Sequence, residues 1–283
     1  MKKNYFLKLL PFVGLAILLG YFTTSCDDDD DLKSTIQLSL VTKITADSGT
    51  EFTFEYNSSY FMTKYTKNDG ASVETNTLSY TNKSQISKRV NDIDGAVKTY
   101  DYIYSGNKVY EKDVDSGIVV DTLTVNEYTK LLYTGNYSSS PQDYGSNITF
   151  EYPSIGLNIP NISKATYYEY QNDSGIKKEY IKTQEYTLGF SEGIYAYFIQ
   201  LPEWFKKHRL PYGYMWGVSN NIQKIEQEEI YKEDGIEINR IPSTITFEAA
   251  FHPWGHPLTI SWKEGGDTHK LTMEYEEISY TYN

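Results

Sequence analysis

Residues 36–56 read IQLSLVTKITADSGTEFTFEY, and this stretch decides the fold. Apolar and polar residues alternate over Ile36–Ile44 and again over Phe52–Tyr56. Alternation with a period of two places the apolar side chains on one face of a β-strand. Between the two segments, Asp47-Ser48-Gly49 supplies the residue types that a tight turn needs. The stretch therefore predicts two antiparallel strands, each with one buried face, joined by a hairpin turn.

The same unit recurs along the chain. Aspartate, asparagine and glycine tolerate the positive φ of hairpin turns, and such residues recur between alternating segments. Repetition of similar hairpins predicts an all-β fold, an antiparallel β-meander curled into an open or partly closed barrel. The further turn signals are Asn68-Asp69-Gly70, Asp94-Gly95, Asp115-Ser116-Gly117, Asp173-Ser174-Gly175, Glu233-Asp234-Gly235 and Glu264-Gly265-Gly266.

The second half of the chain contains the less regular segments. Serine and proline interrupt the alternation, so we expect a loop joint near 135–161. One short helix is expected at Pro202–Arg209, because proline suits the first helical turn and Pro211 ends the helix. Ile225–Lys232 is rich in glutamate, but its position before a hairpin turn favours a strand. The late strands are expected at Ile194–Leu201, Ile222–Lys232, Ile236–Phe251, Leu258–Trp262 and His269–Tyr282.

The composition favours a β fold held together by a hydrophobic core. The chain has 28 Tyr and 12 Phe among 283 residues, and aromatic residues suit pleated, half-buried surfaces. A chain with 1 Cys forms no intrachain disulfide, so apolar burial must stabilise the fold. With 38 acidic and 26 basic residues the surface repels phosphate backbones, so we expect no nucleic-acid partner.

The first residues carry an export signal. Lys2, Lys3 and Lys8 precede an apolar run over Leu9–Leu19, which is the order of a secretory signal peptide. Small residues then lead into the cysteine of Thr23-Thr24-Ser25-Cys26. This arrangement resembles the lipobox of bacterial lipoproteins, in which the cysteine receives diacylglycerol and becomes the first residue after cleavage.

An acidic run follows Cys26 directly. It is similar to the signal that sends Bacteroidota lipoproteins to the outer face of the outer membrane. The resemblance implies a signal peptide over 1–25, an acidic tether over 26–33 and a single β-meander domain over 34–283. It also implies a protein that is lipid-anchored in the outer membrane through Cys26 and exposed on the cell surface. The export signal would consist of Asp27, Asp28, Asp29, Asp30 and Asp31.

A family resemblance extends over the mature chain. It includes the lipobox, the repeated hairpins, the Tyr214–Asn221 stretch YMWGVSNN and the Phe247–Pro257 segment that ends in Trp-Gly-His-Pro. Together these resemble a family of Bacteroidota outer-membrane lipoproteins of unknown function with a porin-like β fold. The hairpins of the first half are also similar to the YD-type repeats of large secreted shells, although most of the defining Tyr-Asp pairs are missing. Neither resemblance implies a catalytic residue.

Two motifs have the spacing of catalytic or metal sites. Gly189-Phe-Ser191-Glu-Gly193 matches the nucleophile-elbow pattern, but an apolar segment follows where a helix is required. We therefore predict a hairpin turn there. His252 and His256 are four residues apart, yet the prolines and glycine around them preclude a helix, so we expect turn histidines that pack on aromatic rings. We expect His269 to pack on an aromatic ring as well. The sequence predicts no metal, cofactor or catalytic residue.

Asp121-Thr122-Leu123 resembles the short O-glycosylation site that Bacteroidota use on exported proteins. Three residues are a small motif, so the resemblance implies a modification site and nothing about the fold.

The densest aromatic segment is Leu201–Val218, which surrounds the basic cluster Lys206–Arg209. Its rings either form an exposed platform for a glycan or close one end of the curved sheet as a plug, and the plug is favoured. We expect a surface lipoprotein that binds a glycan or another extracellular macromolecule, and not an enzyme. The alternative is a structural or accessory subunit of an outer-membrane complex that docks on an outer-membrane protein. The candidate platform residues are Trp204, Tyr212, Tyr214 and Trp216.

Overall fold

The computed structural model describes residues 34–125, 131–137, 144–152, 162–192, 198, 200–210 and 220–282. Contacts group Leu40–Glu276 into one compact unit. The described residues Ser34–Ser39 and Glu277–Tyr282 belong to the other unit, in which Ser39 Oγ donates to Glu277 Oε2 at 2.9 Å. The barrel, its interior and its turns are described below within residues 40–276.

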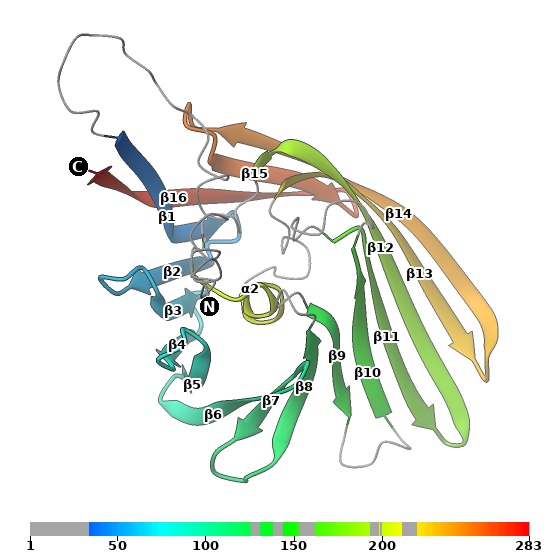
Figure 1. Cartoon of the computed structure of the whole chain (residues 1–283). Helices are drawn as coiled ribbons and strands as arrows, with labels where there is room; N and C mark the ends of the chain where they lie inside the picture. Colours follow the sequence, from blue (N-terminus) through cyan, green and yellow to red (C-terminus); the bar gives the residue numbers. More distant parts are fainter. Residues whose placement is uncertain are drawn as a thin grey trace, which may run out of the picture. The chain divides into compact units, whose positions relative to one another are not determined.

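The described strands form one antiparallel meander (Figure 1). Their order in the sheet follows the sequence and returns from β16 to β1, which is the order of a closed barrel. The predicted all-β meander is thereby confirmed. The strands of the first half are β1 (Ser34–Ala46), β2 (Glu51–Tyr56), β3 (Met62–Asn68), β4 (Val73–Tyr80), β5 (Ile86–Ile93), β6 (Ala96–Ser105), β7 (Lys108–Asp113) and β8 (Val119–Val125). Those of the second half are β9 (Leu131–Tyr137), β10 (Tyr144–Glu151), β11 (Lys164–Asp173), β12 (Ile176–Glu192), β13 (Asn220–Glu233), β14 (Ile236–Phe251), β15 (Pro257–Glu264) and β16 (Asp267–Tyr282).

The hairpin turns lie where the Asp-Gly and Asn-Asp-Gly signals predict them. Asp94 and Gly95 both have positive φ, 51° and 90°, which is the backbone of a turn that matches the twist of its two strands. The first and last strands meet at the closing seam of the barrel. There Asp47 N donates to Lys270 O at 2.9 Å, and Lys270 N donates to Asp47 Oδ2 at 3.1 Å.

Three local predictions are corrected by the structure. The expected loop joint near 135–161 contains β10, whose Tyr144–Glu151 pairs with both β9 and β11. The expected turn at Gly189–Gly193 is wrong for its described part, because β12 continues to Glu192. The expected strand at Ile194–Leu201 is also wrong for its described part, because Phe198, Gln200 and Leu201 are not in a strand. Gly145, Ser146 and Gly189 are residue types that are common in turns, yet they lie within strands β10 and β12.

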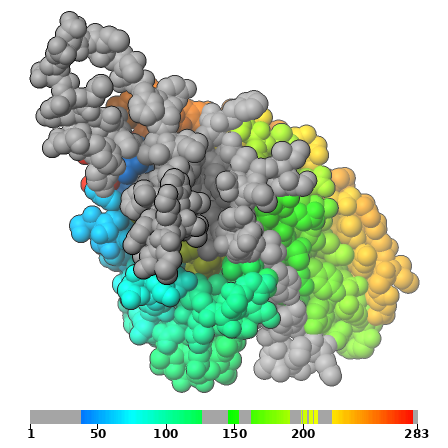
Figure 2. Space-filling model, viewed as in Figure 1, coloured from blue at the N-terminus to red at the C-terminus, as the bar shows by residue number. Residues whose placement is uncertain are grey.

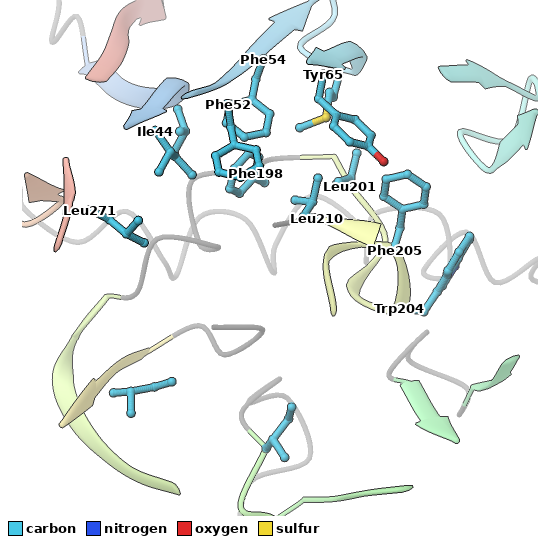
Figure 3. Close-up of a cluster of buried hydrophobic side chains, with 14 of the residues drawn as sticks. Ile44, Phe52, Phe54, Tyr65, Phe198, Leu201, Trp204, Phe205, Leu210 and Leu271 are labelled. Atoms are coloured by element: carbon cyan, nitrogen blue, oxygen red, sulfur yellow. The ribbon is translucent and has the colours of Figure 1, made fainter. Parts of the chain in front are cut away.

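A short helix, α2 (Glu203–Arg209), packs inside the barrel against the first half of the sheet (Figures 1 and 3). Phe205 of α2 packs against Tyr65 on β3, and the two rings lie near each other in Figure 3. Trp204 packs against Tyr102 and Tyr104 on β6. Trp204 and Phe205 are exposed by 1% and 0% of their surface. A helix of this length is unstable alone in water, so this packing holds it. No helix among the described residues is long and apolar enough to cross a bilayer.

Part of the second half extends beyond the core as a projecting sheet, which we define as residues 165–173, 176–184, 227–233 and 236–243 of β11 to β14. In β14 the residues Ile236–Thr244 are all exposed, and burial begins at Ile245. The ladder between β14 and β15 covers Phe247–Phe251. The remainder of β14 therefore has β13 on one side and, among the described residues, no strand on the other.

Candidate functional site

Of the aromatic segment Leu201–Val218, the structure describes residues 201–210, which contain the candidate platform residue Trp204. Its indole ring packs against Tyr102 at 5.2 Å and against Tyr104 at 6.4 Å, measured between ring centroids. With 1% of its surface exposed, Trp204 presents no ring face to a ligand, which is the arrangement of a plug. Tyr212, Tyr214 and Trp216 lie outside the described residues, as do Cys26 and the acidic residues after it.

The polar end of α2 binds two carboxylates on the inner wall of the barrel. His208 Nε2 lies 2.7 Å from Asp121 Oδ2 on β8. Arg209 contacts Glu111 on β7 through Nη2, and the same nitrogen lies 3.5 Å from Asp121 Oδ2. Tyr65 on β3 donates to the carbonyl of Arg209 at 3.4 Å, and burial raises the pKa of Tyr65 to about 12. These contacts fix both the helix and its last turn against the sheet.

Glu111 is the centre of a buried polar network. Its Oε1 accepts from Arg89 Nη2 at 2.7 Å and from the hydroxyl of Tyr102 at 2.9 Å. Arg89 Nη1 in turn donates to Asn76 Oδ1 at 2.8 Å, and Asn91 joins Asn76 to Glu74. Burial raises the pKa of the Tyr102 hydroxyl, so it remains a donor.

This network resembles a metal site in composition only. Ligand atoms of Glu111, Asp121 and His208 lie within 4.8 Å of one another. However, the guanidinium of Arg209 already contacts both carboxylates, and Arg89 contacts Glu111. A divalent cation would have to share the space with one or two fixed positive charges, which Coulomb repulsion opposes. The arrangement is that of a docking site for α2.

A second polar surface lies on the inner face of the projecting sheet, which runs along one side of the molecule in green to orange (Figure 2). We call it the tyrosine face. Strand register places its residues in two adjacent rows that cross β11, β12 and β13. The buried Ala165 and Ile225 project from the same side of β11 and β13, which identifies the face as the inner one. The tyrosine face consists of Tyr167, Glu169, Tyr180, Lys182, Glu229 and Tyr231.

The rings of the tyrosine face are packed together but half-buried. Tyr180 lies between Tyr167, at 5.8 Å, and Tyr231, at 5.1 Å between ring centroids. Neighbouring carboxylates accept hydrogen bonds from two of the hydroxyl groups. Tyr167 donates to Glu169, and Tyr231 donates to Glu229 at 3.1 Å. Burial and the nearby Glu229 raise the pKa of Tyr180, so its hydroxyl stays protonated at neutral pH.

A directed chain of hydrogen bonds leads from the core to this face. The hydroxyl of Tyr186 donates to Gln184, Gln184 donates to Gln227 at 2.8 Å, and Gln227 donates to Glu229 at 3.0 Å. Lys182 Nζ lies 3.6 Å from Glu229 Oε1. The face therefore offers aromatic rings, donors and acceptors in fixed positions, because each side chain is held by a neighbour.

The other residues singled out in the sequence lie apart from both surfaces. As predicted, these histidines pack on aromatic rings: His256, in the turn, lies 4.3 Å from Tyr275, and His269, on β16, stacks on Trp262 at 5.1 Å. Ser191 is within β12 rather than at a strand-to-helix corner. Tyr168 and Tyr170 on β11 project from the opposite face to Tyr167. Because β11 carries tyrosines on both faces, the sequence alone does not indicate the tyrosine face.

Two similar solved structures are porin-like proteins from Bacteroides. The protein from Bacteroides uniformis ATCC 8492 is 14% identical, with 88% of this chain and 99% of that chain covered and a TM-score of 0.37. The protein from Bacteroides vulgatus ATCC 8482 is 12% identical, with 84% and 99% covered and a TM-score of 0.39. No family model and no curated protein matches the chain.

Proposed function

We propose that this chain is a lipoprotein of the outer-membrane surface that binds a glycan through its tyrosine face. The single observation that carries the glycan part is the cluster of half-buried rings formed by Tyr167, Tyr180 and Tyr231. The proposal moves the expected ligand platform from the segment around Trp204 to the projecting sheet.

The chemistry of the tyrosine face suits a sugar. A pyranose ring has an apolar C–H face that packs on an aromatic ring, and hydroxyl groups around its edge that need both donors and acceptors. Tyr180 and Tyr231 supply rings, while Glu169, Glu229 and Lys182 supply acceptors and a donor next to them. Because hydrogen bonds and ion pairs already hold these groups, little side-chain entropy is lost on binding.

The binding test uses the two faces of the same sheet. Tyr180→Ala and Tyr231→Ala should weaken binding to a soluble neutral polysaccharide, tested with starch, xylan and α-mannan by affinity gel electrophoresis. Tyr168→Ala is the matched control, because Tyr168 projects from the opposite face of β11. Equal retardation of wild type and both tyrosine-face variants on every polysaccharide that retards the wild type would sink the proposal, as would no retardation of the wild type by any of them.

The anchoring part is tested separately. Cys26→Ala should leave an unprocessed or mislocalised precursor that takes up no labelled fatty acid. Replacement of Asp27–Asp31 by alanine should keep the lipid but move the protein to the periplasmic face. If protease digests the protein on intact cells equally before and after that replacement, the export-signal interpretation is wrong.

The alternative, an accessory subunit that docks on an outer-membrane protein, has one observation in its favour. Ile236, Ile238 and Ile241 on the projecting part of β14 are exposed by 70%, 58% and 45%. Exposed aliphatic side chains in a group are typical of a docking surface. A partner that co-purifies with the wild type but not with the double variant Ile236→Ser/Ile238→Ser would support this role. Equal co-purification of that partner with the wild type and the double variant would contradict it.

A further inference from the structure

The turns of the barrel belong to two rims. Consecutive antiparallel strands run in opposite directions, so every second turn lies at the same end of the barrel. We call these ends the acidic rim and the neutral rim. The described turns of the acidic rim are residues 47–50, 69–72, 94–95, 114–118, 174–175, 234–235 and 265–266. Those of the neutral rim are residues 57–61, 81–85, 106–107 and 252–256.

The two rims differ in charge. Each described turn of the acidic rim contains or adjoins an aspartate, whereas the described turns of the neutral rim contain neither aspartate nor glutamate. The titratable side chains in those neutral turns are Lys83, Tyr60, His252 and His256. Glu55, on the strand that leads into one of them, is paired with Lys64 at 2.9 Å. The aspartates of the acidic rim are Asp47, Asp69, Asp94, Asp115, Asp173, Asp234 and Asp267.

Turn chemistry does not explain this difference. In the acidic rim Asp69 Oδ1 accepts from the backbone N–H groups of Ala71, at 3.1 Å, and Ser72, at 2.9 Å. In the neutral rim Asn57 Oδ1 does the same for Ser59 and Phe61, both at 3.0 Å. A neutral amide therefore shapes the turn as well as a carboxylate does. The charge must reflect what each rim faces.

The neutral rim also presents a tryptophan. Trp254 is 55% exposed at the turn between β14 and β15, and Leu258 beside it is 36% exposed. The turn beneath it is rigid, because His252 stacks on His256 at 4.6 Å and His252 N donates to His256 O at 2.8 Å. Tryptophan concentrates at the interface between a membrane and water, where its ring is partly apolar and its N–H remains hydrated.

We propose that the neutral rim rests on the lipid surface, with Trp254 in the interfacial layer and the acidic rim facing away. The proposal rests on the lipid anchor at Cys26 and not on glycan binding. Leu40, where the barrel unit begins, lies level with Tyr56 at the neutral rim, since Lys43 pairs with Thr53 and Tyr56 donates to Val41 O. At roughly 3.3–3.6 Å per residue, the chain from Cys26 to Leu40 reaches about 50 Å at most, and this tether joins the barrel unit at the neutral rim.

The repulsion between like charges gives the same orientation. Anionic lipid attracts basic groups and repels acidic ones within about a Debye length, roughly 8–10 Å. A rim of aspartates is therefore disfavoured at the surface, while a rim that presents Lys83 and no carboxylate in its described turns is tolerated. In this orientation the projecting sheet, whose hairpin tips lie at the acidic rim, points away from the membrane into the medium.

The test uses full-length lipidated protein in phosphatidylcholine vesicles with brominated acyl chains, which quench tryptophan at the interface. Uptake of labelled fatty acid is measured first. Wild type should lose fluorescence in brominated vesicles relative to unbrominated ones, and Trp254→Phe should remove most of that loss although 3 of the 4 tryptophans remain. Labelled protein with the same quenching in wild type and Trp254→Phe would overturn the orientation. A protein that takes up no labelled fatty acid would overturn both the orientation and the lipid anchor. The retardation by polysaccharides tests glycan binding independently of the orientation and the anchor.

A second arm adds charge to either rim in vesicles that also contain anionic phosphatidylglycerol. Ser59→Asp/Asn82→Asp/Asn107→Asp in the neutral rim should reduce the quenching of Trp254. The matched control Ser48→Asp/Ala71→Asp/Ile118→Asp places the same charge on exposed positions of the acidic rim and should leave quenching unchanged. Equal quenching in the two triple variants would contradict the proposed orientation.

Discussion

Arg89 on β5 and Glu111 on β7 form an ion pair of 2.7 Å although β6 lies between their strands. Tyr102 on β6 completes the bridge, because its hydroxyl donates to the same carboxylate oxygen. The two charged side chains are exposed by only 8% and 1%. The Glu111 carboxylate therefore faces two guanidinium groups, those of Arg89 and of Arg209 on α2, and the network joins three strands to the helix.

Removal of the central carboxylate should destabilise the barrel strongly. Glu111→Gln leaves Arg89 as a buried cation without its carboxylate partner and leaves Arg209 with Asp121 alone. A broken buried pair typically costs about 3–5 kcal/mol. Chemical denaturation measures the change in the free energy of unfolding. Lys64→Ala, which breaks the exposed pair with Glu55, is the control and should cost at most about 1 kcal/mol. Similar losses in the two variants would mean that the network does not stabilise the fold.

Trp204→Ala should also lower the free energy of unfolding strongly, for a different reason. It removes the largest fully buried side chain of the described residues and leaves a cavity between α2 and β6, which typically costs about 3–5 kcal/mol. Trp254→Ala, at an exposed ring, should change the free energy of unfolding by about 0.5 kcal/mol or less. A nearly unchanged melting temperature for Trp204→Ala would contradict the plug.

Asp113 should contribute a pH-dependent part of the stability. Its carboxylate accepts from Ser116 N at 2.7 Å and Ser116 Oγ at 2.9 Å, which lowers its pKa below the ordinary 3.8. The unfolded chain therefore binds the proton at higher pH than the folded one. The stabilisation is complete above the ordinary pKa and is lost as the pH falls through the lower folded pKa.

Asp113→Asn should flatten this acid limb of the unfolding curve. NMR titration of the Asp113 carboxyl should give a pKa below 3.8 in the folded protein. A folded pKa at or above that value would contradict the prediction, and so would an acid limb that is the same in wild type and Asp113→Asn.

Residues 34–283 should purify without detergent and give a β-type circular dichroism spectrum. Outward positions of neighbouring strands carry Lys64, Lys88 and Asp101, each next to a buried residue that faces inward. Charges on the lipid-facing band of a membrane-spanning barrel are destabilising, so this outer face suits water. A protein that stays folded only in micelles would contradict the prediction.

The hairpins were predictable because their information is local. Alternation around Phe52 and Phe54 identifies the buried face of β2, and Asp94-Gly95 identifies a turn without knowledge of the neighbours. β10 was not predictable in this way. In β10 only Ile148 and Phe150 show apolar alternation with polar neighbours, and the surrounding serines and prolines favour a loop.

Both polar surfaces depend on long-range pairing, which a single sequence does not contain. Glu111 meets Arg209 only because the chain returns α2 to the interior of the barrel after β12. The tyrosine face needs the register between β11, β12 and β13, since a slip by one residue would move Tyr180 to the outside. With tyrosines on both faces of β11, composition could not indicate which of them lie together.

The free edge of β14 has a consequence for copies that the proposed lipid anchor would hold side by side. An unpaired strand is a template on which another copy can add its own strand, and lipid anchors concentrate copies in two dimensions. Pro242 offers no N–H to such a neighbour, and the bulge opposite Tyr231–Lys232 distorts the strand toward its tip. A crowded layer of these proteins should therefore stay free of intermolecular sheets, and any partner of the exposed isoleucines must bind their side chains rather than extend the strand ladder.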